Sequence, residues 1–372
     1  MRFPLLSFTR SVGVVVGLTA GQALSAQTAS HTVSEELHFA SVVAGGAHSC
    51  GLTTEGKAYC WGRNNSGQLG DSSMTDRATP VPVVGGIVFR QLSAGSQHTC
   101  GVSTDDEPFC WGANEHGQLG NGGRVAANRP TPVGGSLLVT LISAGGQHTC
   151  ATRKHWDKQD RALCWGSNQF GQLGDMEQDD SALPVETFGV IQYVSIASGD
   201  MHTCGATRQG KVFCWGGNER GQLGNGSITF SRVPFLGRMN RRVQFVQVVS
   251  GSTHTCGLTA EGQVYCWGDN GAGQVGSGKG PGRAMFPTLV KEAVGYTTVT
   301  AGGATSCGLK GDGSAFCWGA NDAGQYGAAG AASRLPVAAL QGSAWQGLSL
   351  GTSHGCGIKT DGLVACWGKT QP

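Results

Sequence analysis

Fourteen cysteines divide this sequence into seven similar segments. The first cysteines of successive pairs are separated by 50, 50, 54, 52, 51 and 49 residues, and each second cysteine is followed directly by Trp-Gly. A fixed period of this length indicates a repeat architecture, in which each repeat packs against its neighbours. The pairs are Cys50 with Cys60, Cys100 with Cys110, Cys150 with Cys164, Cys204 with Cys214, Cys256 with Cys266, Cys307 with Cys317, and Cys356 with Cys366.

Each repeat contains four short segments that resemble strands. The segment around Cys50 predicts a hairpin, a further run precedes it, and a run containing proline follows it. Four short strands in about 50 residues are typical of a β-propeller blade. We therefore predict an all-β fold, a seven-bladed β-propeller. The seventh repeat lacks its fourth run, and residues 32–39 precede the first repeat, so we expect an N-terminal strand to close the ring.

The paired cysteines predict one disulfide within each hairpin. Positions 50 and 60 lie directly opposite each other only across a loop with an odd number of residues, and a three-residue loop centred on Glu55 meets this condition. The third loop residue must be left-handed, which suits Gly56 and its glycine equivalents in four other repeats and is tolerated by Asp106. Free thiols or zinc ligands are the alternatives, but the CxxC spacings that zinc sites favour are absent.

Residues 1–26 have the order of regions found in a secretory signal peptide. Two arginines precede an apolar run over residues 12–20, and small residues follow up to Ala26. The apolar run is shorter than the roughly 20 residues that a membrane-spanning helix needs, which makes a retained anchor the weaker alternative. We expect a single mature domain over residues 27–372 that is secreted, periplasmic or on the cell surface, without membrane insertion. Disulfides persist in such oxidising compartments.

The composition limits the classes of partner. Twenty-six Lys and Arg residues against 24 Asp and Glu residues leave a formal charge of +2, and charged residues make up only 13% of the chain. A protein with so little net charge has no strong positive electrostatic potential to attract nucleic acid or an anionic membrane, so we predict no nucleic-acid binding. Hydrophobic residues account for 39% of the chain, which excludes a disordered protein.

The repeat AGGxHTCGLTxDGxVYCWGxNxxGQLG resembles that of the regulator of chromosome condensation family, over about residues 38–368. The resemblance implies a seven-bladed β-propeller. The family includes a nuclear exchange factor for a Ran-type GTPase, plant light receptors and secreted bacterial proteins. The paired cysteines are most similar to exported members, such as the extracellular domains of crinkly-type receptor kinases. The signal peptide, the near-neutral charge and the lack of a long wedge-like insertion distinguish this chain from the nuclear exchange factor.

No catalytic residue, metal site or cofactor is predicted. Six repeats carry a histidine two residues before the first cysteine, and a ring of imidazoles could bind a metal. A side chain repeated in nearly every blade more often satisfies the same hydrogen bond in each blade. Residues 351–355 match the GxSxG pattern of hydrolases, yet they align with corresponding segments of other repeats. Acidic residues between Asp175 and Glu186 imitate a calcium loop, but Asp180 occupies the position that requires glycine.

Two departures from the repeat predict a binding face. The third hairpin is four residues longer than the others, and its tip places a tryptophan among charged residues. The connection after the fourth hairpin combines aromatic residues with arginines, as protein interfaces do. The predicted partner-binding residues are His155, Trp156, Phe230, Arg232, Phe235, Arg238, Arg241 and Arg242.

These features together predict an exported, non-catalytic binding or scaffold protein. It would act as a monomer and recognise a protein or a surface glycan through its propeller loops. Two alternatives remain open. One is a regulator of a GTPase that resembles a guanine-nucleotide exchange factor, and the other is an enzyme with a site at the mouth of the central channel.

Overall fold

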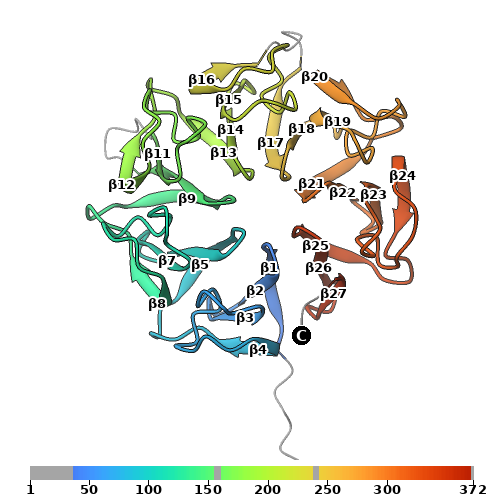
Figure 1. The fold of residues 1–372 in the computed structure, drawn as a ribbon. Helices are drawn as coiled ribbons and strands as arrows, with labels where there is room; N and C mark the ends of the chain where they lie inside the picture. Colours follow the sequence, from blue (N-terminus) through green and yellow to red (C-terminus); the bar gives the residue numbers. More distant parts are fainter. Residues whose placement is uncertain (1–36, 155–160, 238–242, 370–372) are drawn as a thin grey trace, which may run out of the picture. The chain divides into compact units, whose positions relative to one another are not determined.

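Seven antiparallel sheets surround a central axis (Figure 1). The computed structural model describes residues 37–154, 161–237 and 243–369. Within these residues six sheets have four strands, one sheet has three, and there is no helix that could cross a membrane. The structure confirms the predicted all-β, seven-bladed propeller.

The strands of each blade follow the chain outward from the axis, so sequence order and sheet order coincide. The innermost strands are β1 (Phe39–Ala44), β5 (Phe89–Ala94), β9 (Val139–Ala144), β13 (Tyr193–Ser198), β17 (Phe245–Ser250), β21 (Tyr296–Gly302) and β25 (Trp345–Leu350). The second strands are β2 (His48–Thr53), β6 (His98–Ser103), β10 (His148–Arg153), β14 (His202–Thr207), β18 (His254–Thr259), β22 (Thr305–Lys310) and β26 (His354–Lys359). The third strands are β3 (Ala58–Gly62), β7 (Pro108–Gly112), β11 (Ala162–Gly166), β15 (Val212–Gly216), β19 (Val264–Asp269), β23 (Ala315–Gly319) and β27 (Val364–Gly368). The outermost strands are β4 (Arg77–Pro82), β8 (Ala127–Pro132), β12 (Ser181–Glu186), β16 (Ser231–Leu236), β20 (Arg283–Leu289) and β24 (Ser333–Ala339).

A disulfide links the second and third strands of every blade. Cys50 lies directly opposite Cys60, and their Cα atoms are 4.0 Å apart. The third residue of the hairpin loop is left-handed as predicted, with φ of 78° at Gly56 and 66° at Asp106.

The same register recurs in the other six blades, and no cysteine is free. The predicted pairing is confirmed in every blade, and the free-thiol and zinc alternatives are wrong. The six further disulfides join Cys100 to Cys110, Cys150 to Cys164, Cys204 to Cys214, Cys256 to Cys266, Cys307 to Cys317, and Cys356 to Cys366.

The hydrophobic core lies between adjacent blades. Leu52 and Leu69 of the first blade form one buried cluster with Phe89 and Trp111 of the second. The Phe89 and Trp111 ring centroids are 5.8 Å apart, and Trp111 is fully buried. Similar clusters recur around the ring, so each blade completes its core only when its neighbour is in place.

At each of the first five seams, one backbone carbonyl joins a blade to the next. The Gln68 carbonyl, in the WGxNxxGQ turn of the first blade, accepts hydrogen bonds from Trp111 Nε1 at 3.0 Å and from the Thr99 hydroxyl at 2.9 Å. His48 Nε2 lies 2.8 Å from the same hydroxyl. Because the hydroxyl gives its only hydrogen to Gln68, His48 Nε2–H must be the donor. The same three contacts recur at the carbonyls of Gln118, Gln172, Gln222 and Gln274.

The seam between the sixth and seventh blades lacks the histidine contact. Thr305 replaces the histidine of the sixth blade, and Gly355 replaces the Ser or Thr of the seventh. The Thr305 hydroxyl instead donates to the Ala320 carbonyl of its own blade at 2.8 Å. A Cβ at position 355 would lie 2.8 Å from the Trp367 ring. Both partners of the missing hydrogen bond are therefore absent at the same seam.

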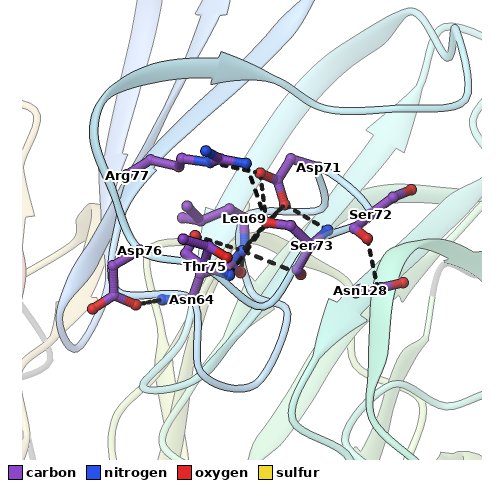
Figure 2. A network of polar contacts seen from close by, with 9 residues as sticks. All are labelled: Asn64, Leu69, Asp71, Ser72, Ser73, Thr75, Asp76, Arg77 and Asn128. Atoms are coloured by element: carbon purple, nitrogen blue, oxygen red, sulfur yellow. Dashed lines mark hydrogen bonds and ion pairs between the residues drawn. The ribbon is translucent and has the colours of Figure 1, made fainter.

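Asn64 holds the turn that continues from Gln68 into Leu69, and Figure 2 shows its contacts with the residues that follow. Asn64 Oδ1 accepts the backbone N–H of Leu69 at 3.0 Å, and Asn64 Nδ2 donates to Asp71 Oδ1 at 3.1 Å. The turn also contacts the next blade, because Asn128 Nδ2 of β8 donates to the Ser72 carbonyl at 3.0 Å. The repeated asparagine thus fixes the position of the carbonyl on which the seam depends.

The seventh blade meets the first at the start of β1. The Phe39 N–H donates to the Gly362 carbonyl at 2.9 Å. Phe39 itself pairs with Thr53 of β2, so it belongs to the first blade. Residues 32–36 of the expected closing strand lie outside the described residues. Within the described residues the seventh sheet consists of β25, β26 and β27.

Glycines next to the axis allow the blades to approach closely. A Cβ at Gly95 would lie 2.5 Å from the Gly145 carbonyl oxygen of the next blade and 2.5 Å from His98 Cε1 of its own blade. Five other blades show a similar approach to a histidine ring. Backbone and imidazole occupy the space that any side chain would need.

Replacing Gly95 with alanine should therefore destabilise the ring. We expect Gly95→Ala to lower the free energy of unfolding by about 2 kcal/mol or more, because neither the carbonyl nor the packed imidazole can move away freely. Chemical denaturation under non-reducing conditions measures the effect. Gly347→Ala is the matched control: a Cβ there meets nothing within 4 Å, so its change should stay within about 0.5 kcal/mol. Equal effects of the two substitutions would contradict the close packing at the axis.

Candidate functional site

The repeated histidines are buried hydrogen-bonding groups and do not line the central channel. Burial lowers their pKa values, because the charged imidazole loses its hydration, and neighbouring histidines of the ring add to the effect at His48. The pKa falls to about 3 for His48, His148 and His202 and to about 4 for His98, His254 and His354. Their Nε2 atoms contact hydroxyls of the next blade, and no group of three or more His, Cys, Asp or Glu side chains among the described residues could hold a metal ion.

Residues 351–355, which match the GxSxG pattern, comprise the loop between β25 and β26 and the first two residues of β26. The Gly351 N–H donates to the His354 carbonyl at 2.8 Å, as the Gly95 N–H does to His98 in the second blade. His354 Nε2 lies 2.9 Å from the Ser49 hydroxyl of the first blade. The segment therefore has the same structural position as the corresponding loop of other blades.

The acidic residues that imitate a calcium loop have separate structural roles. Asp175 Oδ1 accepts hydrogen bonds from Asn168 Nδ2 and from the Glu177 N–H. Glu186 lies farther along the chain in β12 and pairs with Arg161 at 2.8 Å. Asp175 stabilises its turn, whereas Glu186 forms an ion pair at the blade surface.

The predicted third hairpin tip is described only at its base. Lys154 is described, whereas His155 and Trp156 lie outside the described residues. Lys154 Nζ pairs with Asp106 of the second hairpin tip, and Arg90 Nε donates to the same carboxylate at 2.9 Å. The hydrogen bond from Lys154 and the nearby Arg90 charge lower the pKa of Asp106. The base of the third tip therefore contacts the second blade.

The described members of the residues predicted after the fourth hairpin lie in β16 or directly before it. Phe230, Arg232 and Phe235 are all exposed. Phe230 directly precedes Ser231, the first residue of β16, which pairs with Gly216. Phe235 lies at the opposite end of the strand, next to Leu236. Arg238, Arg241 and Arg242 lie outside the described residues. The described members of this group form an extended outer edge and do not gather at one loop.

Sequence reasoning missed two exposed valines near the start of neighbouring innermost strands. We call the side of the ring that carries the hairpin tips the hairpin side. The first strand of each blade begins on this side. For example, the Phe245 N–H at the start of β17 donates to the Gly210 carbonyl in the hairpin tip of the preceding blade at 3.0 Å. Val194 and Val246, the second residues of β13 and β17, are 43% and 50% exposed. Arg90 occupies this position in the second blade, so a position-by-position comparison of the repeats would have revealed the apolar pair.

Models of the "Regulator of chromosome condensation (RCC1) repeat" match this chain in two forms. One matches residues 39–68, 89–118, 193–222, 245–274 and 296–325. The other matches residues 55–102, 105–152, 159–206, 209–258 and 261–309, which together make up more than half of the chain. The chain belongs to the regulator of chromosome condensation family.

Individual members of the family align with different parts of the chain. The human E3 ubiquitin-protein ligase HERC2 is 29% identical over 168 residues, which cover 44% of this chain and 4% of HERC2. Yeast RCC1 (Prp20), solved bound to Kap60, superimposes with a TM-score of 0.75 and 22% identity over 86% of this chain and 80% of its own. The ectodomain of the Arabidopsis thaliana receptor kinase ACR4 gives a TM-score of 0.56 and 22% identity over 90% and 97%. At these identities the two structures show a shared fold.

The buried histidines predict that the protein loses stability in mild acid. The unfolded chain takes up protons near pH 6.5, whereas the folded imidazoles remain neutral down to about pH 4. The stabilisation is therefore complete above pH 6.5 and decreases as the pH falls through this window, by up to about 1.4 kcal/mol per pH unit for each histidine. Urea denaturation at pH 7.5, 6 and 5 should show a progressive decrease in the free energy of unfolding.

Single histidine variants provide the control. His98→Asn should make the free energy of unfolding depend less steeply on pH, by the amount that corresponds to about one proton, because it removes one buried neutral imidazole. His38→Asn removes an exposed histidine, whose Nδ1 lies 2.9 Å from the Asp361 carbonyl, and should change the slope less, because no buried imidazole is lost. A free energy of unfolding that stays constant between pH 7.5 and 5 would show that the ring does not hold neutral histidines.

Proposed function

We propose that this chain is an exported, non-catalytic binding protein that recognises a protein or a surface glycan through the hairpin side of its propeller. A protein is the favoured partner. Yeast RCC1 (Prp20) is solved in complex with the protein Kap60, and the plant structure of similar fold is the ectodomain of a receptor kinase. Both support a role in which the propeller binds another protein.

The observation that carries the proposal is the apolar surface of the hairpin side at blades four and five. Val194 lines the channel, Val246 is the equivalent residue of the next blade, and Val190 in the connection before β13 is 57% exposed. Exposed apolar side chains grouped in this way favour contact with a partner. The predicted Trp156 and the arginines after the fourth hairpin would add anchoring residues of the types that dominate binding energies.

The interior of the blades supports a binding role over catalysis. The histidines, tryptophans and glutamines that recur in the repeats are engaged in hydrogen bonds between blades. Their chemistry is thus committed to holding the ring together. The residues left to define a function are those that differ from one blade to the next, and these lie mainly in exposed segments.

Export rests on the disulfides and on the N-terminal sequence. Seven disulfides suggest an oxidising environment, because cytosolic thiols are kept reduced. Residues 1–26 have the composition of a signal peptide but lie outside the described residues. Together they favour a location in the periplasm, on the cell surface or outside the cell.

A partner recovered by pulldown from the native extracytoplasmic fraction tests the proposed surface. We expect the double variant Val194→Ser/Val246→Ser to weaken binding about tenfold or more, because it removes apolar area from the contact. Trp156→Ala and Arg241→Ala/Arg242→Ala should have similar effects. Isothermal titration calorimetry provides the affinities, and melting temperatures verify folding.

Ile228→Ser is the matched control, because Ile228 is 51% exposed and lies between the third and fourth strands of blade four. The Ile228→Ser variant should bind the recovered partner with the same affinity as the wild type. Unchanged binding by all hairpin-side variants would place the interface elsewhere. A GTPase partner whose nucleotide release is accelerated would instead support the exchange-factor alternative, and substrate turnover lost on changing channel residues would support an enzyme.

A further inference from the structure

An axial channel runs between the seven innermost strands. Its cavity has a volume of about 460 Å³, and its wall is built mainly from glycine, alanine, serine and aliphatic residues. Most polar side chains of the wall are already engaged with a neighbouring blade. Gln91 Nε2 donates to the Ile142 carbonyl at 3.1 Å and Gln91 Oε1 accepts its N–H at 3.3 Å, and Ser195 forms a similar pair of contacts with Val248.

The backbone donors at one mouth of the channel are also engaged. This mouth is formed by the loops between first and second strands, and we call it the loop-side mouth. The Gly46 N–H donates to the Gly95 carbonyl at 3.0 Å, and the Ser96 N–H donates to the Gly145 carbonyl at 3.1 Å. The Thr352 N–H donates to the Gly45 carbonyl at 3.2 Å. The mouth therefore presents few free N–H groups to a ligand, whereas its hydroxyl and carboxylate oxygens can still accept hydrogen bonds.

Asp200 is the single ionisable side chain among the described residues that line this channel. The carboxylate interacts with Ser252 and has no ion-pair partner within the described part of the chain. The equivalent positions in the other repeats are uncharged: Gly46, Ser96, Gly146, Ser252, Gly303 and Thr352. A half-buried carboxylate without a counter-charge is costly, and the ring does not need one at this position.

The loop that carries Asp200 is fixed from both sides. The Asp200 N–H donates to the Ser252 carbonyl of the fifth blade at 3.2 Å. On the other side the Asp200 backbone packs against Gly146 of the third blade, where a Cβ would lie 2.6 Å from the Asp200 carbonyl oxygen. The carboxylate is therefore held at the mouth before any ligand arrives, which reduces the entropy lost on binding.

We propose that the loop-side mouth of the channel binds one organic cation, an alkylammonium or guanidinium group, through the Asp200 carboxylate and the hydroxyls of Ser96, Ser252 and Thr352. These oxygen acceptors match a group that carries several N–H donors and one positive charge. A cationic group of this kind can belong to a free amine or to a basic side chain of a protein. The proposed site is formed by channel residues alone and does not require the hairpin side to bind a partner.

Other ligand classes fit the channel poorly. An anion would meet the carboxylate and would find the backbone donors already engaged. A divalent metal ion commonly takes several carboxylate or imidazole ligands, and the channel supplies one carboxylate. A sugar ring would normally stack on an aromatic side chain, and the described channel lining contains none.

The site should respond to pH in a defined direction. Burial raises the pKa of Asp200, because the charged carboxylate loses hydration, while the hydrogen bond from Ser252 partly opposes the shift. A bound cation stabilises the ionised form, so affinity should be highest at neutral pH and should decrease as the pH falls and the carboxylate becomes protonated.

Isothermal titration calorimetry with agmatine tests the proposal on the full chain at pH 7.5 and low ionic strength. The uncharged analogue N-butylurea, calcium chloride and a blocked Gly-Arg-Gly peptide are the comparison ligands. We expect agmatine to bind, N-butylurea and calcium not to bind, and the peptide to bind only if the mouth admits a guanidinium attached to a chain. Binding of agmatine but not of the peptide would assign the site to free amines.

Substitutions at the mouth complete the test. Asp200→Asn and Asp200→Ser, the latter matching the second and fifth blades, should weaken agmatine binding at least tenfold, with a melting temperature equal to or above that of the wild type. Asp179→Asn removes an equal charge at an exposed position outside the channel and should bind like the wild type. The proposal is overturned if agmatine does not bind the folded wild type at 20 mM, if the Asp200 variants bind it equally well, or if calcium binds in its place.

Discussion

At five of the seven seams between the described blades, a backbone carbonyl that accepts two hydrogen bonds at once holds one blade against the next. At the first seam the Gln68 carbonyl receives both the Trp111 indole and the Thr99 hydroxyl, and that hydroxyl accepts from His48. Other repeated residues of the blade position the groups that make this contact. The asparagine of the turn fixes the carbonyl, the disulfide keeps the second and third strands in register, and the axial glycine leaves room for the imidazole. The same burial lowers the pKa of the imidazole, because the charged form would lose its hydration, so His48 donates as a neutral side chain at neutral pH.

This use of the repeated residues separates structure from function within the blade. A side chain that recurs at every seam is engaged with its neighbour and has little freedom to evolve a new activity. The sixth seam shows how strictly the residues are coupled, because Thr305 and Gly355 lose both members of one hydrogen bond together. Functional features are therefore expected where single repeats differ. Asp200 in the channel and Val246 on the hairpin side are both departures of this kind.

The sequence was sufficient to predict the features that depend on local spacing. The interval between Cys50 and Cys60 required a three-residue loop with a left-handed third residue, and Gly56 and Asp106 have that conformation. The seam contacts could not be predicted in this way, because they join residues about 30 to 50 positions apart whose approach depends on the angle between blades. The role of Asp200 was missed for a different reason. A lone aspartate after glycine is unremarkable in a chain, and only the ring shows that its neighbours in space are uncharged.

Each cystine is closed within a single blade, and no covalent bond other than the main chain joins one blade to another. Considered as a network of covalent bonds, the propeller is a linear string of seven small loops. A single protease cut in a connection between blades would therefore divide the protein into two covalently separate fragments. Cohesion of a nicked ring would depend entirely on the hydrogen bonds and apolar contacts at its seams, whereas a cut at a hairpin tip would leave both ends tethered by the disulfide.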